Sequence, residues 1–331
     1  MAAGQLSIRP LRTGEEAAAN DGFNRAFGLD RSLEEWSWKF PPEPQGRLVM
    51  VAVDDEDRIQ AHYAGVPATF QVDGQEWPAA NIVDVYSARE ARGRFCRRGV
   101  WVRSVERLLE EFGRGGSGSL LYGFPSPRPL RLGVLQLGYD AVEPQGIGYL
   151  RREAGAVRSA PLGRRLYRAE LARDWEPRLD DLWRRVRGRY PAAVVRDARR
   201  AARRLAGHPS VVYHRFMVTP RLASSPVGFA AFRTDGGICR WVDLVWDEEH
   251  PGALDLLAHI GARLAREREA GFEEMWLTGD DEATQRLVAH GFVPGPEPQK
   301  LVFVARAFHP ELDVTRLDGR VYLTMADADL V

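Results

Sequence analysis

The stretch NIVDVYS (Asn81–Ser87) reads as an apolar strand, and the loop RGRFCRRG (Arg92–Gly99) follows it. An amphipathic helix is predicted next, because apolar side chains recur there every three or four residues. A second strand, LLYGFPS (Leu120–Ser126), and a helix ending in LGY (Leu137–Tyr139) complete the stretch. A strand, a cationic loop and a helix in this order present backbone N–H groups to a phosphate at the helix N-terminus. We therefore predict a site here for a cofactor that carries a pyrophosphate.

The bulk composition indicates a globular protein of two domains. The chain has 331 residues, of which 44% are hydrophobic, and this is ample for two cores. Lys plus Arg and Asp plus Glu both total 46, so the formal net charge is zero. A balanced charge argues against a general binder of nucleic acid or membranes, and we expect neither DNA nor a membrane as a partner.

The two cysteines, Cys96 and Cys239, cannot form a disulfide framework or a metal knuckle. We therefore expect no metal and a reduced, cytoplasmic setting. The first residues lack the apolar core of a signal peptide, and nowhere is there a run of about 18 apolar residues that could span a bilayer.

Local signals place several elements before the central stretch. Thr13 with Glu16, and Ser32 with Glu35, have the spacing of capping boxes, so each pair predicts the start of a helix. Two strands are predicted farther along, and Asp73-Gly74 between apolar runs is typical of a two-residue hairpin turn.

The second half of the chain repeats features of the first half in the same order. Three pairs of positions correspond: Lys39 with Arg204, Asp84 with Asp243, and Gly138 with Gly291. We infer a duplication, with Arg152–Arg165 as the linker between the copies.

Several segments in sequence order resemble the GNAT (Gcn5-related N-acetyltransferase) superfamily. They are the W-K-F segment before a proline, GVPATFQVDG (Gly65–Gly74), IVDVY, YGFPS and LGY, and the tail VYLTMADADLV is similar to that of bacterial members. The resemblance implies an α+β (α/β) fold of two tandem GNAT-like acyl-CoA N-acyltransferase domains, residues 1–155 and 156–331. Each would be a mixed, mostly antiparallel sheet flanked by helices. It also implies transfer of an acyl group, usually acetyl, from coenzyme A to an amine.

The resemblance also implies where acetyl-CoA binds. The pantetheine would lie between two diverging strands, and the pyrophosphate at the start of the following helix. The expected cofactor-binding residues are Val85, Tyr86, Ser87, Arg92, Gly93, Arg94, Arg97, Arg98, Gly99, Val100 and Ser126. The loop lacks the closely spaced glycines of the family pattern, so a solvated arginine-rich turn before a core helix stays an alternative.

The second copy departs further from the family. The loop DEEHPG (Asp247–Gly252) is acidic where a phosphate would bind, so we expect this half not to bind coenzyme A. Its expected role is to support the first domain or to help form the substrate cleft.

The family's usual tyrosine acid is missing, because Val134 and Leu287 stand at its position in the two copies. Tyr139, Tyr122 and Tyr86 are candidate substitutes, and the alternative is that a tyrosine in such a strand belongs to the core. Asp84 is a candidate base with a raised pKa, and the alternative is a structural carboxylate in a strand. The terminal carboxylate of Val331 is a further candidate base.

Two other features of the sequence have ordinary structural interpretations. His62 lies in a predicted strand, and we interpret it as a core histidine. Residues 184–204 hold nine arginines, and a solvated helix face explains them better than a nucleic-acid patch does.

The predicted function is N-acetyl transfer from acetyl-CoA to a small-molecule amine by direct attack on the thioester. One alternative is a catalytically degenerate GNAT scaffold that binds a ligand or a partner protein. A second alternative is an aminoacyl-tRNA-dependent transferase of tandem GNAT fold. The oligomeric state stays open, with a homodimer as one candidate.

Overall fold

The computed structural model describes residues 6–42, 47–88, 100–114, 118–127, 129–131, 133, 145–155 and 165–329. The chain forms two compact units. Unit 1 consists of Met1–Thr69, Trp77–Glu143 and Phe303–Thr315, and unit 2 of Phe70–Glu76, Pro144–Val302 and Arg316–Val331. These units are defined by contacts, and each includes a segment from the other half of the sequence. The tandem domains 1–155 and 156–331 rest instead on the inferred duplication of the sequence, and they stay a prediction.

Unit 1 is built on a mixed sheet whose strands follow the order β1-β2-β3-β4-β5-β15. The strands are β1 (Ser7–Pro10), β2 (Val49–Val53), β3 (Ile59–Val72), β4 (Gln75–Ser87), β5 (Leu120–Gly123) and β15 (Val302–Ala307). The pairs β1–β2, β2–β3 and β5–β15 are antiparallel, whereas β4 and β5 run parallel. A parallel pair within an antiparallel sheet is the arrangement that the resemblance implied.

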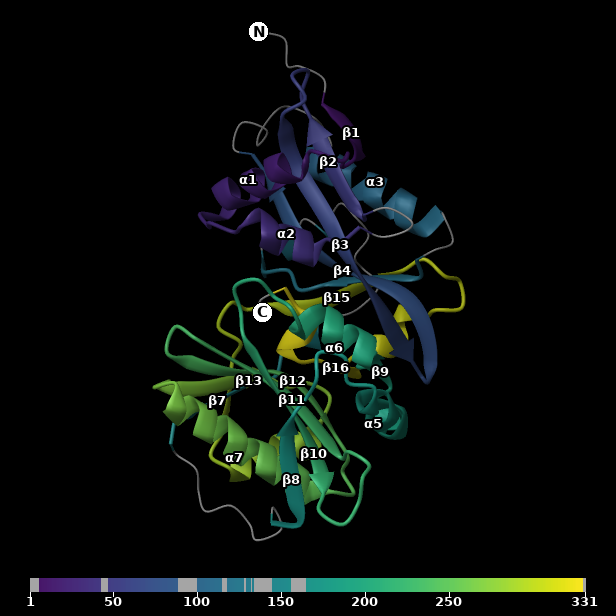
Figure 1. Cartoon of the computed structure of the whole chain (residues 1–331). Coiled ribbons are helices and arrows are strands. Elements are labelled where there is room, and N and C mark those ends of the chain that lie inside the picture. Colours follow the sequence, from purple (N-terminus) through teal and green to yellow (C-terminus); the bar gives the residue numbers. More distant parts are fainter. Residues whose placement is uncertain are drawn as a thin grey trace. The chain divides into compact units, whose positions relative to one another are not determined.

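Helices lie on both faces of this sheet (Figure 1). They are α1 (Glu16–Phe27), α2 (Leu33–Lys39) and α3 (Val100–Arg114). Val105 and Leu108 of α3 pack against Met50 and Tyr63 on one face. On the other face, Trp36 of α2 is fully buried in a cluster with strand residues. The period-two alternation of β2 and β3 separates these two cores.

Unit 2 contains a seven-stranded sheet with the order β14-β7-β13-β12-β11-β10-β8. The strands are β7 (Tyr149–Glu153), β8 (Tyr167–Leu171), β10 (Tyr213–Pro220), β11 (Gly228–Asp235), β12 (Ile238–Trp246), β13 (Phe272–Trp276) and β14 (Val293–Gly295). Again one neighbouring pair, β12 and β13, is parallel and the others are antiparallel. Both sheets are therefore mixed and mostly antiparallel, as predicted.

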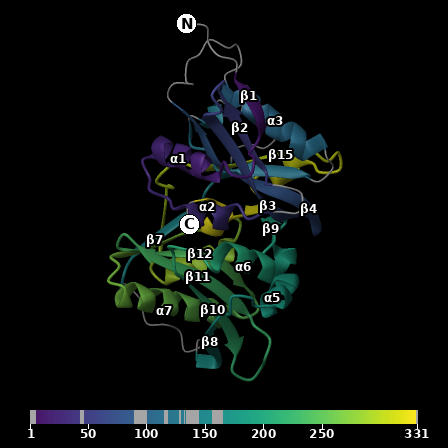
Figure 2. The ribbon, with the colours of Figure 1, turned by 45° about the horizontal axis from the view of Figure 1, so that its top comes forward.

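The longest helix of unit 2 covers one face of its sheet. It is α7, and it contacts β10, β11, β12 and β13 (Figure 2). Helix α7 spans Pro251–Glu267, and the other helices are α5 (Arg178–Val186), α6 (Ala198–Leu205) and α8 (Asp281–Ala289). Short pieces complete the chain: β6 (Gln145–Gly146), β9 (Ala192–Val194), β16 (Val321–Tyr322) and the 3₁₀ turns Arg187–Arg189, Val314–Leu317 and Met325–Asp327. Within the described residues, no helix has the length and apolar character needed to cross a membrane.

Two of the three local signals are confirmed. Asp73 and Gly74 both have positive φ, 48° and 84°, as a type I′ hairpin turn requires. The capping box of Ser32 with Glu35 is complete at the start of α2. The capping box predicted at Thr13 is wrong, because α1 begins at Glu16, whose carboxylate instead accepts hydrogen bonds from the Gly14 N–H and from an arginine.

Candidate functional site

The parallel strands of unit 1 separate after a short ladder. Their pairing runs from Ala79 with Leu120 to Asn81 with Tyr122. Strand β5 ends one residue later, whereas β4 continues to Ser87. Among the described residues, no strand pairs with the end of β4 on its β5 side. The backbone of this end therefore presents an open edge of the kind to which an extended ligand can add.

Strand β4 carries a bulge on this open end. Ile82 and Val85 pack against the α3 side of the sheet, whereas Val83 and Asp84 both meet α2 on the other face. Two consecutive side chains on one face break the period-two alternation. Asp84 has φ +49°, in the left-handed region that aspartate tolerates better than most residues. The bulge turns the backbone just before Tyr86 and Ser87.

Two cations hold the Asp84 carboxylate. The guanidinium of Arg31 lies 2.7 Å from one oxygen and the ammonium of Lys39 lies 2.5 Å from the other. Burial by itself would raise the pKa of Asp84, but the charges of Lys39 and Arg31 outweigh it and lower the pKa. The raised pKa expected of a catalytic base is therefore wrong, and Asp84 is ionised and ion-paired.

Local structure around α2 places both cations. Arg31 directly precedes the helix cap Ser32, and Lys39 ends the helix. The guanidinium of Arg31 also donates to the side chain of Asn20 at 2.7 Å and lies 3.8 Å from the centre of the Phe23 ring. These contacts fix Arg31 from α1, so the ion pair depends on both helices.

The carbonyl of the bulge residue orients a buried histidine. Nδ1 of His62 lies 2.7 Å from the oxygen of Asp84. A carbonyl only accepts, so Nδ1 carries the hydrogen and Nε2 keeps a lone pair. Nε2 is buried and has no hydrogen-bond partner among the described residues. Burial lowers the pKa of His62, so the ring is neutral.

Tyr86 closes this cluster from the other side. Its ring stacks on His62 with the ring centres 5.2 Å apart, and its hydroxyl donates to the Ala19 carbonyl at 2.9 Å. Burial raises the pKa of Tyr86. The side chain is therefore committed to the packing of α1 on the sheet, and only its backbone is available to a ligand.

The structure brings some of the predicted residues together and does not describe others. Val85, Tyr86 and Ser87 form the open end of β4, and Val100 begins α3. Ser126 follows β5, and its carbonyl accepts from the Leu130 N–H at 3.0 Å. The remaining predictions lie outside the described residues: Arg92, Gly93, Arg94, Arg97, Arg98, Gly99, Tyr139 and Val331.

Sequence reasoning missed the contribution of Arg31, whereas the interpretation of His62 as a core histidine is confirmed by its burial. The signal for Arg31 was present in the internal repeat. Arg31 precedes Arg196 by 165 positions, the same offset that separates Lys39 from Arg204. Both arginines stand just before the cap of a helix, and Arg196 binds Asp243 as Arg31 binds Asp84.

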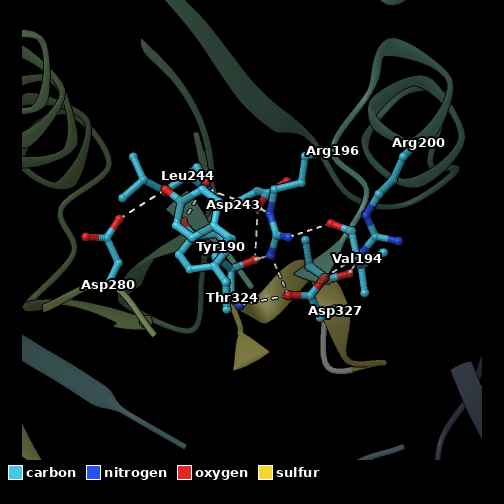
Figure 3. A network of polar contacts seen from close by, with 11 residues as sticks. Tyr190, Val194, Arg196, Arg200, Asp243, Leu244, Asp280, Thr324 and Asp327 are labelled. Atoms are coloured by element: carbon cyan, nitrogen blue, oxygen red, sulfur yellow. Dashed lines mark hydrogen bonds and ion pairs between the residues drawn. The ribbon is translucent and has the colours of Figure 1, made fainter. Parts of the chain in front are cut away.

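Unit 2 repeats the aspartate on its own diverging strand. Strands β12 and β13 pair from Ile238 only as far as Trp241, and a register shift lies opposite Asp243. The guanidinium of Arg196 is 3.0 Å from Asp243 and 2.5 Å from Asp327 (Figure 3). Arg196 is fully buried, so this ion-paired network is shielded from solvent.

The second carboxylate of this network belongs to the C-terminal segment 321–329. Thr324 donates to Asp243 at 2.9 Å, and Arg200 binds Asp327 at 2.9 Å (Figure 3). Arg204 donates to the Ala328 carbonyl. These arginines belong to the basic stretch that we interpreted as a solvated face, and that interpretation is wrong for Arg196, Arg200 and Arg204.

The C-terminal segment contacts both diverging strands of unit 2. Leu323 exchanges two backbone hydrogen bonds of 3.1 Å with Thr278, just past the end of β13. On the opposite side, the Tyr322 hydroxyl donates to the Leu244 carbonyl of β12 at 2.7 Å. The segment thus lies at the opening between β12 and β13, whereas in unit 1 no strand of the described residues pairs at the corresponding place.

Comparisons with known proteins agree with this architecture. Residues 7–130 match the family model described as an acetyltransferase (GNAT) domain. A search of curated proteins finds no match. The fold is similar to that of a GCN5-related N-acetyltransferase from Anabaena variabilis, with a TM-score of 0.69 and 14% identity over 92% of this chain and 73% of that chain.

Two further solved structures are similar. A GCN5-related N-acetyltransferase from Kribbella flavida has a TM-score of 0.65 and 18% identity over 92% of this chain and 71% of that chain. The N-myristoyltransferase of Saccharomyces cerevisiae with bound myristoyl-CoA has a TM-score of 0.61 and 12% identity over 92% of this chain and 84% of that chain. At these identities the likeness concerns the fold.

Proposed function

Because residues 7–130 match the family model of an acetyltransferase (GNAT) domain, we propose that this chain transfers an acetyl group from acetyl-CoA to the amine of a small molecule. The observation that carries the proposal is the separation of β4 from β5 after Asn81. The pantetheine lies along the open end of β4 and bonds to the backbone of Val85, Tyr86 and Ser87. The yeast N-myristoyltransferase of similar fold, which binds myristoyl-CoA, supports an acyl-CoA as the donor.

The pyrophosphate of the coenzyme binds at the start of α3. We propose that backbone N–H groups of Gly93, Gly99 and Val100 bind it, because the N-terminus of a helix favours negative charge. The guanidinium groups of the same loop add charge; they belong to Arg92, Arg94, Arg97 and Arg98. Ser126 lies past the end of β5, on the other side of the opening.

The chemistry is a direct displacement. The amine nitrogen attacks the thioester carbon, which forms the C–N bond and a tetrahedral oxyanion, and collapse of this intermediate breaks the C–S bond. The amine loses a proton and the departing thiolate gains one. We assign the proton donation to Tyr139.

Asp84 has a different task in this proposal. Its lowered pKa and its two ion pairs make it a poor proton acceptor at neutral pH. Its carboxylate anchors the bulge that sets the backbone of Val85–Ser87. Asp84 is therefore a positioning residue, and the sequence alternative of a structural carboxylate is the one we retain.

The structure of unit 2 supports a single coenzyme site per chain, in unit 1. Its own C-terminal segment occupies the place between β12 and β13. The loop before α7 also carries Asp247, which is buried and ion-paired with Arg185 at 2.9 Å, and two further acids. A pyrophosphate there would meet negative charge rather than free N–H groups.

Isothermal calorimetry with acetyl-CoA tests the proposed loop. Arg92→Ala with Arg98→Ala should weaken binding at least about tenfold, or ~1.4 kcal/mol. The matched control is Arg184→Ala with Arg263→Ala, which removes the same charge from exposed ion pairs of unit 2 and should leave affinity unchanged. Equal affinity of the loop variant and the wild type would reject the loop as the phosphate site.

A catalytically degenerate scaffold is the second candidate function. The observation that favours it is the ion-paired Asp84, because two ion pairs make the one candidate base that the structure describes a poor proton acceptor. Acetyl-CoA should then raise the melting temperature without turnover for any amine in a panel. Release of coenzyme A that depends on an added amine, detected with a thiol reagent, would reject the scaffold.

A further inference from the structure

The sheet of unit 2 ends in a short strand with an open edge. Strand β8 (Tyr167–Leu171) pairs with β10 and, among the described residues, with no other strand. Its register with β10 is antiparallel, with Val218 opposite Ala169. Unpaired strand edges bind other strands unless the protein blocks them.

The hydrogen bonds to β10 determine which backbone groups of β8 face outward. Ala172 donates to the Arg215 carbonyl at 2.8 Å, and the Leu166 carbonyl accepts from Arg221 at 2.8 Å. Even-numbered residues of β8 therefore bond to β10, because hydrogen-bonded pairs alternate along an antiparallel ladder. The N–H and C=O groups of Tyr167, Ala169 and Leu171 consequently point away from the sheet.

The side chains along this edge leave apolar surface uncovered. Leu166 and Leu171, at the two ends of β8, are each 67% exposed, and Trp175 just beyond is 56% exposed. Between them, Arg168 and Glu170 are exposed on the opposite face of the strand from Tyr167 and Leu171. The edge thus carries one positive and one negative side chain at neighbouring positions on one face.

We infer that β8 pairs with β8 of a second copy of the chain about a two-fold axis at Ala169. In that antiparallel register Tyr167 faces Leu171 of the second copy, and Arg168 faces its Glu170. The outward backbone groups of Tyr167, Ala169 and Leu171 fall on the hydrogen-bonded positions. Arg168 and Glu170 fall on the non-hydrogen-bonded positions, where opposite side chains are closest.

The sequence of the strand favours a second copy over a foreign strand. When two copies of YRAEL pair antiparallel, opposite charges face each other and the tyrosine ring faces the exposed leucine. An isologous interface needs such self-complementarity, since each contact occurs twice. Glu170 also forms an ion pair with Arg178 of its own chain at 2.5 Å. Because Glu170 already has this partner, its ion pair with Arg168 of the second copy determines the strand register more than it strengthens the dimer.

Charge exchange tests this dimer. Sedimentation velocity over an approximately hundredfold range of concentration should show a monomer–dimer equilibrium for the wild type. Arg168→Glu and Glu170→Arg alone each place like charges at both symmetric positions, so each should weaken dimerisation about tenfold. The double variant R168E/E170R restores opposite charges and should restore the dimer.

A control and a backbone variant complete the design. Arg263→Glu makes the same charge change on an exposed part of α7 and should leave the dimer intact. Ala169→Pro removes an outward N–H that β10 does not use, so the variant should stay folded by circular dichroism and become monomeric. The inference is overturned if the wild type is monomeric at every concentration, or if R168E/E170R dimerises no better than either single variant.

Discussion

Replacing Asp84 by asparagine isolates the charge of the residue that anchors the bulge. Asparagine has the same shape and also tolerates a positive φ, so the backbone of β4 is retained. Arg31 and Lys39 lose the negative charge of Asp84, while their side chains stay only 12% and 9% exposed. Removing one partner of a buried ion pair costs about 3–5 kcal/mol, and the slight exposure of the cations favours the lower end, ~3 kcal/mol.

A loss of ~3 kcal/mol in a domain of this size should lower the melting temperature of unit 1 by roughly 6–12 °C, measured by calorimetry. Asp84→Ala should cost at least ~1 kcal/mol more, because alanine is strained at a positive φ. Asp243→Asn is the matched control: Arg196 keeps Asp327, so the loss should be smaller, ~1–2 kcal/mol.

The effect also has a pH signature. The pKa of Asp84 is lowered, so its stabilisation is present above the pKa of an unfolded aspartate, about 3.9, and is lost as the pH falls through the folded value. Wild type and Asp84→Asn should therefore converge in acid. An Asp84→Asn melting temperature within about 1 °C of the wild type at neutral pH would refute the ion-pair account.

Two further predictions concern His62 and Gly279. Burial lowers the pKa of His62, so the unfolded state binds the extra proton and stability should fall as the pH drops below about 6.5. His62→Gln should reduce the dependence of the free energy of unfolding on pH between pH 7 and 5, measured in urea. Part of this dependence should remain because burial also lowers the pKa of His214. An unchanged pH dependence would contradict a neutral His62. Gly279→Ala should destabilise unit 2 by ~2–4 kcal/mol in urea, because φ is +75° and a Cβ would lie 2.7 Å from the Val321 carbonyl. Gly319→Ala, at φ +64° in open space, should cost only ~1 kcal/mol, and equal losses would mean that the C-terminal segment is not packed against Gly279.

Local signals in the sequence predicted local structure. Asp73-Gly74 and Ser32 with Glu35 succeed because their hydrogen bonds close within a few residues. The capping box at Thr13 fails because the Glu16 side chain that it requires binds Arg47 instead, 31 positions away.

The site required contacts that no local pattern encodes. The two cationic partners of Asp84 lie 53 and 45 positions earlier, and the tautomer of His62 depends on the backbone of a bulge 22 positions away. The sign of the Asp84 pKa shift follows from those partners, so the sequence alone pointed to a raised value. The family resemblance supplied the diverging strands, whereas the C-terminal segment that fills them in unit 2 depends on packing across about 80 positions.

The central claim is that the coenzyme lies along the open end of β4 in unit 1. A crystal structure of the chain grown with acetyl-CoA tests it most directly. We predict one coenzyme per chain, with its pantetheine bonded to the backbone of Val85–Ser87 and its pyrophosphate at the start of α3. A coenzyme between β12 and β13, or none at saturating concentration, would contradict the account.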